Sequence, residues 1–126
     1  MHSSNDILVI DDDASIAEMI GEVLREEGCA VRSACDSTRA LRAIAAQLPA
    51  LILLDATMPA GRTTLFEQLR SQARARAPIV IMSAAPRLDE TVRAQGAADF
   101  LAKPFDLDDL LACVARYVPD PQPLAQ

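Results

Sequence analysis

Short apolar runs alternate with helix-like patterns along the chain, and this alternation most constrains the fold. Four runs end in or next to polar residues, at 7–10, 51–54, 79–82 and 97–102. A weaker run at 30–34 has Val31 as its only β-branched residue. Continuous apolar strands suit a sheet that is covered on both faces, as parallel sheets are. The pattern therefore predicts five strands of a parallel sheet.

Five segments with helical periodicity lie between and after these runs. We expect Gly28 and Pro49 to stop the first two helices, a capping box at Thr64 to begin the third, and Asp106 to cap the fifth; the fourth is expected from 87 to 95. The residues expected to face the core are Ile16, Met19, Ile20, Val23, Leu24, Ala40, Leu41, Ile44, Ala45, Leu48, Leu65, Leu69, Val92, Leu107, Leu110, Leu111, Val114 and Val118. A β-α unit repeated five times with right-handed connections gives an α/β, doubly wound parallel sheet.

Length and composition are those of one globular domain. The chain has 126 residues, of which 51% are hydrophobic, and no apolar run approaches the roughly 20 residues that span a bilayer. We expect a cytoplasmic domain over 1–118, with no membrane association, and a proline-rich tail or linker over 119–126. The net charge of −6 disfavours direct nucleic-acid binding by this domain.

Cysteine usage does not point to a metal or a disulfide framework. The three cysteines, Cys29, Cys35 and Cys113, are an odd number and lack metal-ligand spacing. We therefore expect free thiols, buried or half-buried.

Polar side chains stand where four of the predicted strands end. Asp11 and Asp12 follow the first strand, Asp55 the third, Ser83 the fourth and Lys103 the fifth. The carboxyl ends of the strands form the ligand crevice of a doubly wound sheet. We therefore expect three carboxylates, one hydroxyl and the only lysine of the chain to share one pocket.

Such a cluster of carboxylates repels itself unless a cation is present. Mg²⁺ prefers oxygen ligands and is commonly held by one or two carboxylates together with phosphate oxygens. The sequence therefore predicts a Mg²⁺ site that handles phosphate, in which Lys103 offers a point cation and Ser83 a hydrogen bond. Asp13, by contrast, is expected to cap the following helix.

Four segments carry a family resemblance. They are 7–13, 51–55 followed by Met58-Pro59, 79–84, and 96–105. In this order and spacing they resemble the receiver domains of two-component response regulators, and the resemblance covers residues 6 to about 118. It implies a flavodoxin-like (βα)5 fold with strand order 2-1-3-4-5.

The resemblance also implies a role for individual residues. The domain would not be an enzyme beyond its own phosphorylation and dephosphorylation. Asp55 would be the phospho-acceptor. Asp12 would be a direct metal ligand, Asp11 a largely water-mediated ligand, and Thr57 a ligand through its backbone carbonyl. Ser83 and Lys103 would contact the phosphoryl group, Phe100 would be the aromatic switch, and the Lys103-Pro104 peptide would be cis.

The implied phosphoryl donor is a phosphohistidine on a sensor histidine kinase or a histidine phosphotransfer protein. Phosphorylation would alter the surface made by helix 87–95, strand 97–102 and the helix after Asp106. That surface would then act on an attached effector domain or a separate downstream protein.

The chain departs from the family pattern in several places. Arg62 and Thr63 stand where the family usually has Asp-Gly, and the stretch from Ser83 to Gly96 is about two residues shorter than usual. Ala85 and Thr57 occupy positions tied to the rate of autodephosphorylation. Phe100 lacks the hydroxyl that many relatives carry there.

Two other functions fit parts of the pattern. Asp11-Asp12-Asp13, Ser83 and Lys103 resemble the layout of haloacid-dehalogenase-type phosphatases, in which Asp11 would be the nucleophile, but Asp55 would then be unexplained. A receiver fold that works by binding alone, without phosphate, is the second alternative.

Overall fold

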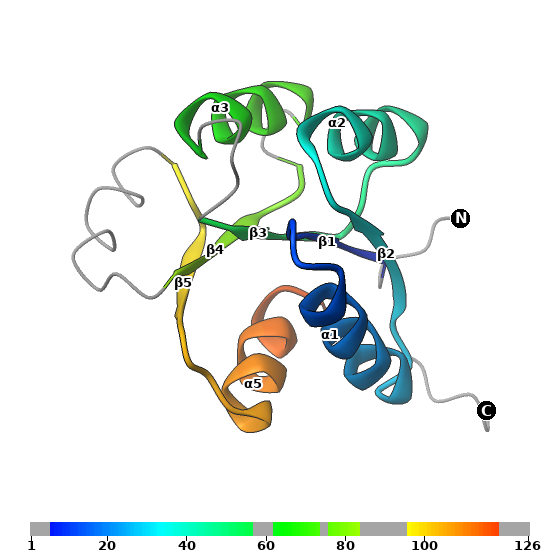
Figure 1. The fold of residues 1–126 in the computed structure, drawn as a ribbon, viewed down its shortest axis with the longest axis vertical. Coiled ribbons are helices and arrows are strands. Elements are labelled where there is room, and N and C mark those ends of the chain that lie inside the picture. The colour runs from blue at the N-terminus through cyan, green and yellow to red at the C-terminus, as the bar shows by residue number, and fades with distance from the viewer. Residues whose placement is uncertain (1–5, 57–61, 74–75, 84–95, 119–126) are drawn as a thin grey trace.

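The protein folds as one five-stranded parallel sheet between two layers of helices (Figure 1). The structure is a computed structural model that describes residues 6–56, 62–73, 76–83 and 96–118. The strands are β1 (Asp6–Ile10), β2 (Ala30–Ala34), β3 (Leu51–Asp55), β4 (Ile79–Ser83) and β5 (Asp99–Ala102). Their spatial order is β2-β1-β3-β4-β5, which confirms the predicted doubly wound topology.

Four described helices cover the sheet, two on each face. They are α1 (Ala14–Glu26), α2 (Ser37–Ala46), α3 (Arg62–Ala73) and α5 (Leu107–Tyr117). Figure 1 shows α1 and α5 on one face of the sheet and α2 and α3 on the other. The helix expected at 87–95 lies outside the described residues.

The sheet is buried because its central strands are apolar on both sides. All five residues of β1, β3 and β4 are buried. Alternate residues of the strands point into two separate cores. Leu8 and Leu54 pack with α2 and α3 on one face, and Val9 and Leu53 pack with α1 and α5 on the other. This two-sided burial is why the strands lack polar alternation in the sequence.

Helix ends follow the predicted capping residues in most cases. The Asp13 carboxylate accepts hydrogen bonds from the backbone N–H of Ser15 and Ile16, and Asp106 forms a capping box with Asp109. Gly28 has φ of 93°, in the left-handed region that ends helices cheaply. The predicted start of α3 was wrong: the helix begins at Arg62, so Thr64 lies inside it. A Ser/Thr-x-x-Glu spacing spans one helical turn and therefore also occurs within helices.

Some residues expected to face the core do not. Met19 is 55% exposed and Leu107 is 51% exposed. The buried side of α1 consists of Ala17, Ile20, Gly21 and Leu24. Two of these four residues, Ala17 and Gly21, are small and allow the helix to approach the sheet closely. Small residues carry little weight in a hydrophobic pattern, which shifted the predicted face.

One more of these residues, Ala45, is exposed, whereas Leu48 packs against the core although it lies beyond the end of α2 at Ala46. Leu107 is the first residue of α5, whose buried stripe begins one turn later at Leu110.

Candidate functional site at the carboxyl edge of the sheet

The acidic residues predicted from strands β1 and β3 lie together. Asp11, Asp12 and Asp55 each offer a carboxylate oxygen, and these oxygens all lie within 4.8 Å of one another. They line one cavity at the carboxyl edge of the sheet together with Lys103. Asp11 and Asp55 are each only 1% exposed, whereas Asp12 faces solvent.

Parallel pairing aligns the strand ends that carry these groups. Ile10 pairs with Leu54, so the residues that follow, Asp11 and Asp55, emerge side by side. Asp55 in turn pairs with Met82, one residue before Ser83. The short β-α connections then begin at this edge and keep the carboxylates near the sheet.

Lys103 reaches the acidic cluster from the far side of β4. Its Nζ lies 2.9 Å from Oδ1 of Asp55 and 3.9 Å from Oδ2 of Asp11. The backbone N–H of Lys103 donates to the carbonyl of Ser83 at 2.8 Å, and the Lys103-Pro104 peptide is cis. The lysine is therefore fixed at its backbone as well as at its ammonium group.

Of the two carboxylate oxygens of Asp11, only one accepts a hydrogen bond from the described residues. Its Oδ1 accepts the backbone N–H of Asp13 at 2.9 Å, while its Oδ2 is buried without a hydrogen bond from the described residues. Burial raises the pKa of Asp11; the Asp13 N–H and Lys103 oppose this rise, and the Asp55 and Asp12 carboxylates add to it. A cation bound near Oδ2 would stabilise the charged carboxylate and so oppose the raised pKa.

These observations test whether the site suits a metal ion. The donor set consists of carboxylate oxygens, one of which is buried and lacks a hydrogen-bond partner. Hard divalent cations such as Mg²⁺ and Ca²⁺ take oxygen ligands of this kind. The acidic cluster could therefore hold a metal.

The structure describes only some of the remaining predicted site residues. Ser83 ends β4 and is buried, with 3% of its surface exposed. Phe100 is half-buried on β5 and packs against the core shared with α2 and α3. Thr57 lies outside the described residues, as do Met58-Pro59 and Ala85.

Sequence reasoning missed one contact that shapes the site. The N–H of Asp13 fixes the orientation of Asp11 while its side chain caps α1. A backbone donor has no signature in the residue types. The run of three aspartates was the only available signal.

Comparisons with known proteins identify the class of domain. The family model of the response regulator receiver domain matches residues 7–115, and this chain belongs to that family. Among solved structures, chemotaxis protein CheY4 of Vibrio cholerae superposes with a TM-score of 0.82 at 28% identity, covering 91% of this chain and 99% of that one. The receiver domain of NtrX from Brucella abortus gives 0.82 at 31% identity, covering 90% and 98%.

Curated relatives are longer than this chain. The nitrogen assimilation regulatory protein NtrX of Azorhizobium caulinodans is 34% identical over 117 residues, which is 90% of this chain and 26% of that protein. The DNA-binding response regulator MtrA of Mycolicibacterium paratuberculosis is 39% identical over 110 residues, covering 86% and 48%. The chain thus spans about a quarter of NtrX and about half of MtrA.

Proposed function

We propose that the chain accepts a phosphoryl group on Asp55 from a phosphohistidine, as a receiver in a two-component system or phosphorelay. One observation carries this proposal: Asp55 is buried at the end of β3, beside Asp11 and 2.9 Å from the ammonium of Lys103. A carboxylate held next to a fixed cation is arranged for reaction with a phosphoryl group.

The chemistry exchanges one phosphorus bond for another. An oxygen of Asp55 attacks phosphorus, a P–O bond forms, and the P–N bond to the donor histidine breaks as the imidazole leaves. Lys103 then lies where its charge can offset that of the phosphoryl oxygens. Ser83, at the end of β4, donates its hydroxyl to another of these oxygens.

We propose Mg²⁺ as the cation of the acidic cluster. Asp12 and Asp55 would bind it directly, Asp11 largely through water, and Thr57 through its backbone carbonyl. When bound, the ion neutralises charge on the phosphoryl oxygens. The domain would catalyse only its own phosphorylation and dephosphorylation and would not act on another substrate.

The output of phosphorylation would pass through β5 and α5. As Ser83 turns toward the phosphoryl group, Phe100 gains room to rotate inward, which changes the surface of β5, α5 and the segment at 87–95. The phosphoryl group can bias the two states only through its differential contacts. The receiver domain would occupy 1–118, with 119–126 as a tail or linker.

The partners follow from this scheme. The donor would be a sensor histidine kinase or a histidine phosphotransfer protein, and the target an attached effector domain or a downstream protein. Several relatives are named as DNA-binding regulators, so the proposal that nucleic acid is not bound concerns this acidic domain alone. No described helix is long and apolar enough to cross a membrane, and we propose a cytoplasmic location.

Acetyl phosphate provides the direct test. With Mg²⁺ present, the native chain should gain one phosphoryl group by intact-protein mass spectrometry, and hydroxylamine should remove it. Asp55→Asn should gain none, while Asp36→Asn, an equal charge change at the exposed cap of α2, should behave as native. A hydroxylamine-sensitive phosphoryl group on Asp55→Asn would refute the assignment.

The two alternatives make different predictions. A phosphatase of the haloacid-dehalogenase type would turn over p-nitrophenyl phosphate, and Asp11→Asn rather than Asp55→Asn would abolish the turnover. A phosphate-independent scaffold would keep full function in its pathway with Asp55→Ala. Membership of the receiver family favours the phospho-accepting function over the phosphatase, and the acidic cluster beside Lys103 favours it over the scaffold.

A further inference from the structure

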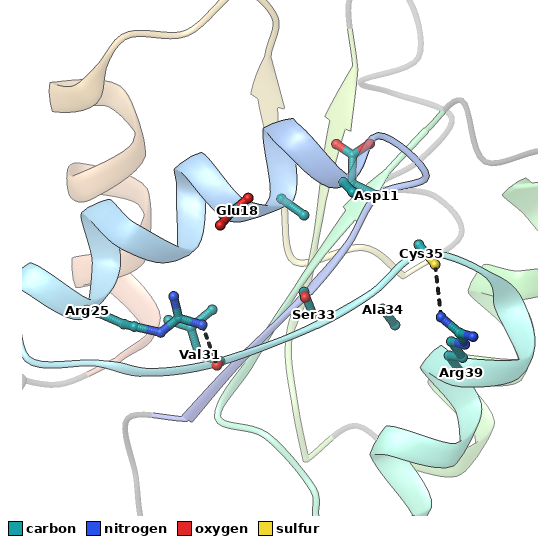
Figure 2. A pocket seen from close by; sticks show the side chains of 10 residues that line it. Asp11, Glu18, Arg25, Val31, Ser33, Ala34, Cys35 and Arg39 are labelled. Atoms are coloured by element: carbon teal, nitrogen blue, oxygen red, sulfur yellow. Dashed lines mark hydrogen bonds between the residues drawn. The ribbon is translucent and has the colours of Figure 1, made fainter.

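The loop between β1 and α1 holds Asp11 at two points. Its backbone N–H donates to the carbonyl of Ala34 on β2 at 3.1 Å, and its Oδ1 accepts the N–H of Asp13 at 2.9 Å. Figure 2 shows the pocket between α1 and β2, in which Asp11 lies beside the first turn of α1 and directs its carboxylate away from Ala34. The bond to β2 fixes where Asp11 lies, and the bond from Asp13 fixes which way its carboxylate turns.

The side chain of Asp13 ties this loop to the first turn of α1. Its Oδ1 accepts the N–H of Ser15 at 3.0 Å and that of Ile16 at 3.3 Å, and its carbonyl accepts the N–H of Ala17 at 3.1 Å. Ala17 is 6% exposed and belongs to the core that α1 shares with α5. Asp13 is therefore fixed to a helical turn that is itself packed against the sheet.

The second oxygen of Asp11 points to a ligand independently of this cap. Oδ2 is buried and accepts no hydrogen bond from the described residues, and it lies 3.9 Å from Nζ of Lys103. Rotation of the carboxylate to exchange the two oxygens would break the hydrogen bond from the Asp13 N–H to Oδ1. That hydrogen bond therefore holds Oδ2 on the side of the acidic cluster.

Asp12 lies between the two fixed residues. Its side chain is exposed, yet it offers one of the three carboxylate oxygens that lie within 4.8 Å of one another. With Asp11 fixed at β2 and Asp13 at α1, the backbone on either side of Asp12 has little freedom to move. A ligand on a fixed backbone needs less ordering when a cation binds.

We propose that Asp13 is a positioning residue for the metal site: its cap of α1 preorganises Asp11 and Asp12, while Asp13 itself does not bind the ion. This inference rests on the proposed Mg²⁺ site at the acidic cluster. Loss of the cap leaves backbone N–H groups at the start of α1 without an acceptor, and the first turn frays. The Asp13 N–H then bonds Oδ1 of Asp11 for less of the time, and cation binding must also order the loop.

Three substitutions at position 13 separate the cap from the charge. Asp13→Asn and Asp13→Ser keep an oxygen that caps the helix but remove the negative charge, whereas Asp13→Ala removes both. In calorimetric titrations of the whole chain with Mg²⁺, the Asn and Ser variants should lose about twofold in affinity, through charge alone. Asp13→Ala should lose about tenfold, the low end of what removal of an orienting group costs, because the backbone N–H remains.

A matched control separates positioning from general destabilisation. Asp36 caps α2 with the same kind of side chain, accepting the N–H of Arg39 at 2.8 Å, and it is not part of the acidic cluster. Asp36→Ala should lower the urea midpoint of unfolding as Asp13→Ala does, because each variant loses one helix cap. It should nevertheless change the Mg²⁺ affinity less than about twofold.

Hydrogen exchange follows the cap without any metal. After correction for intrinsic rates, the amide of residue 13 should exchange faster in metal-free Asp13→Ala than in the native chain, and at a nearly native rate in Asp13→Ser. Equal Mg²⁺ affinities of the Ala, Asn and Ser variants, native exchange in Asp13→Ala, or an equal loss of affinity in Asp36→Ala would overturn the inference and leave the metal site intact. A native chain that takes up no Mg²⁺ would overturn the metal site and the inference together.

Discussion

The ammonium nitrogen of Lys103 lies 2.9 Å from Oδ1 of Asp55, across the intervening strand β4. The two residues are 48 positions apart in the sequence. Their contact links β5, which leads into α5, to the proposed site of phosphorylation. Any new charge on Asp55 therefore acts directly on Lys103.

Removal of the ammonium group should separate chemistry from output. We expect Lys103→Met to fold but to take up phosphate from acetyl phosphate about 10²-fold more slowly, because a fixed cation at the phosphoryl oxygens is lost. Once phosphorylated, it should show little change in the backbone NMR signals of β5 and α5. Arg42→Gln, which removes a cation from the surface of α2, should match the native chain. Native shift changes in Lys103→Met would contradict this role.

The exposed carboxylate of Asp12 should dominate metal affinity. We expect Asp12→Asn to weaken Mg²⁺ binding at least about tenfold by isothermal titration calorimetry, since a direct ligand is lost. Asp36→Asn removes the same charge from a helix cap outside the acidic cluster and should change the affinity less than twofold. Equal effects of the two variants would mean that net charge, rather than coordination, governs binding.

The carboxylate of Asp99 should make stability depend on acid pH. Burial opposes its ionisation, but hydrogen bonds from the Phe100 N–H, the Tyr117 hydroxyl and Arg116 outweigh this, and the pKa is lowered from 3.8. A lowered folded-state pKa gives stability that is present above about pH 4 and is lost as pH falls through the folded value. Asp99→Asn should therefore cost about 1–2 kcal/mol of unfolding free energy at pH 7.

Urea denaturation at pH 7 and near pH 3 measures this dependence. The difference between the native chain and Asp99→Asn should shrink at the lower pH, because protonation of Asp99 in the unfolded chain then favours unfolding. A difference that stays constant between the two pH values would show that the ionised form contributes nothing.

Arg32 should be the most costly surface arginine to remove. It makes an ion pair with buried Asp6, with Nη2 to Oδ2 at 2.7 Å, and donates to the carbonyls of Ala43 and Gln47 at the end of α2. Arg32→Ala leaves a buried carboxylate without its cation and should lower the unfolding free energy by about 2–4 kcal/mol. Arg39→Ala, whose side chain is 68% exposed, should change it by less than about 0.5 kcal/mol. Urea denaturation of both variants measures the contrast.

Much of the fold was predictable because buried parallel strands have a plain signature. The apolar runs ending at Ile10, Leu54 and Met82 gave the strands, and polar residues directly after them marked the carboxyl edge. The meeting of Asp11, Asp55 and Lys103 then followed from strand parallelism. The roles of these residues came from the family resemblance and stay predictions here.

The errors arose where tertiary packing outweighs local pattern. Ala17 and Gly21 set the buried face of α1, although Met19 is the larger apolar residue. The hydrogen bond from the Asp13 N–H to the Asp11 carboxylate has a backbone donor, so the residue types do not encode it.

The position of the phosphoryl group tests the central claim most directly. Borohydride reduces an aspartyl phosphate to homoserine, so treatment of the acetyl-phosphate-labelled chain followed by tandem mass spectrometry marks the acceptor residue. The account predicts homoserine at position 55 alone, and only in samples that contained Mg²⁺. Homoserine at position 11 or 12, or equal labelling without the metal, would contradict it.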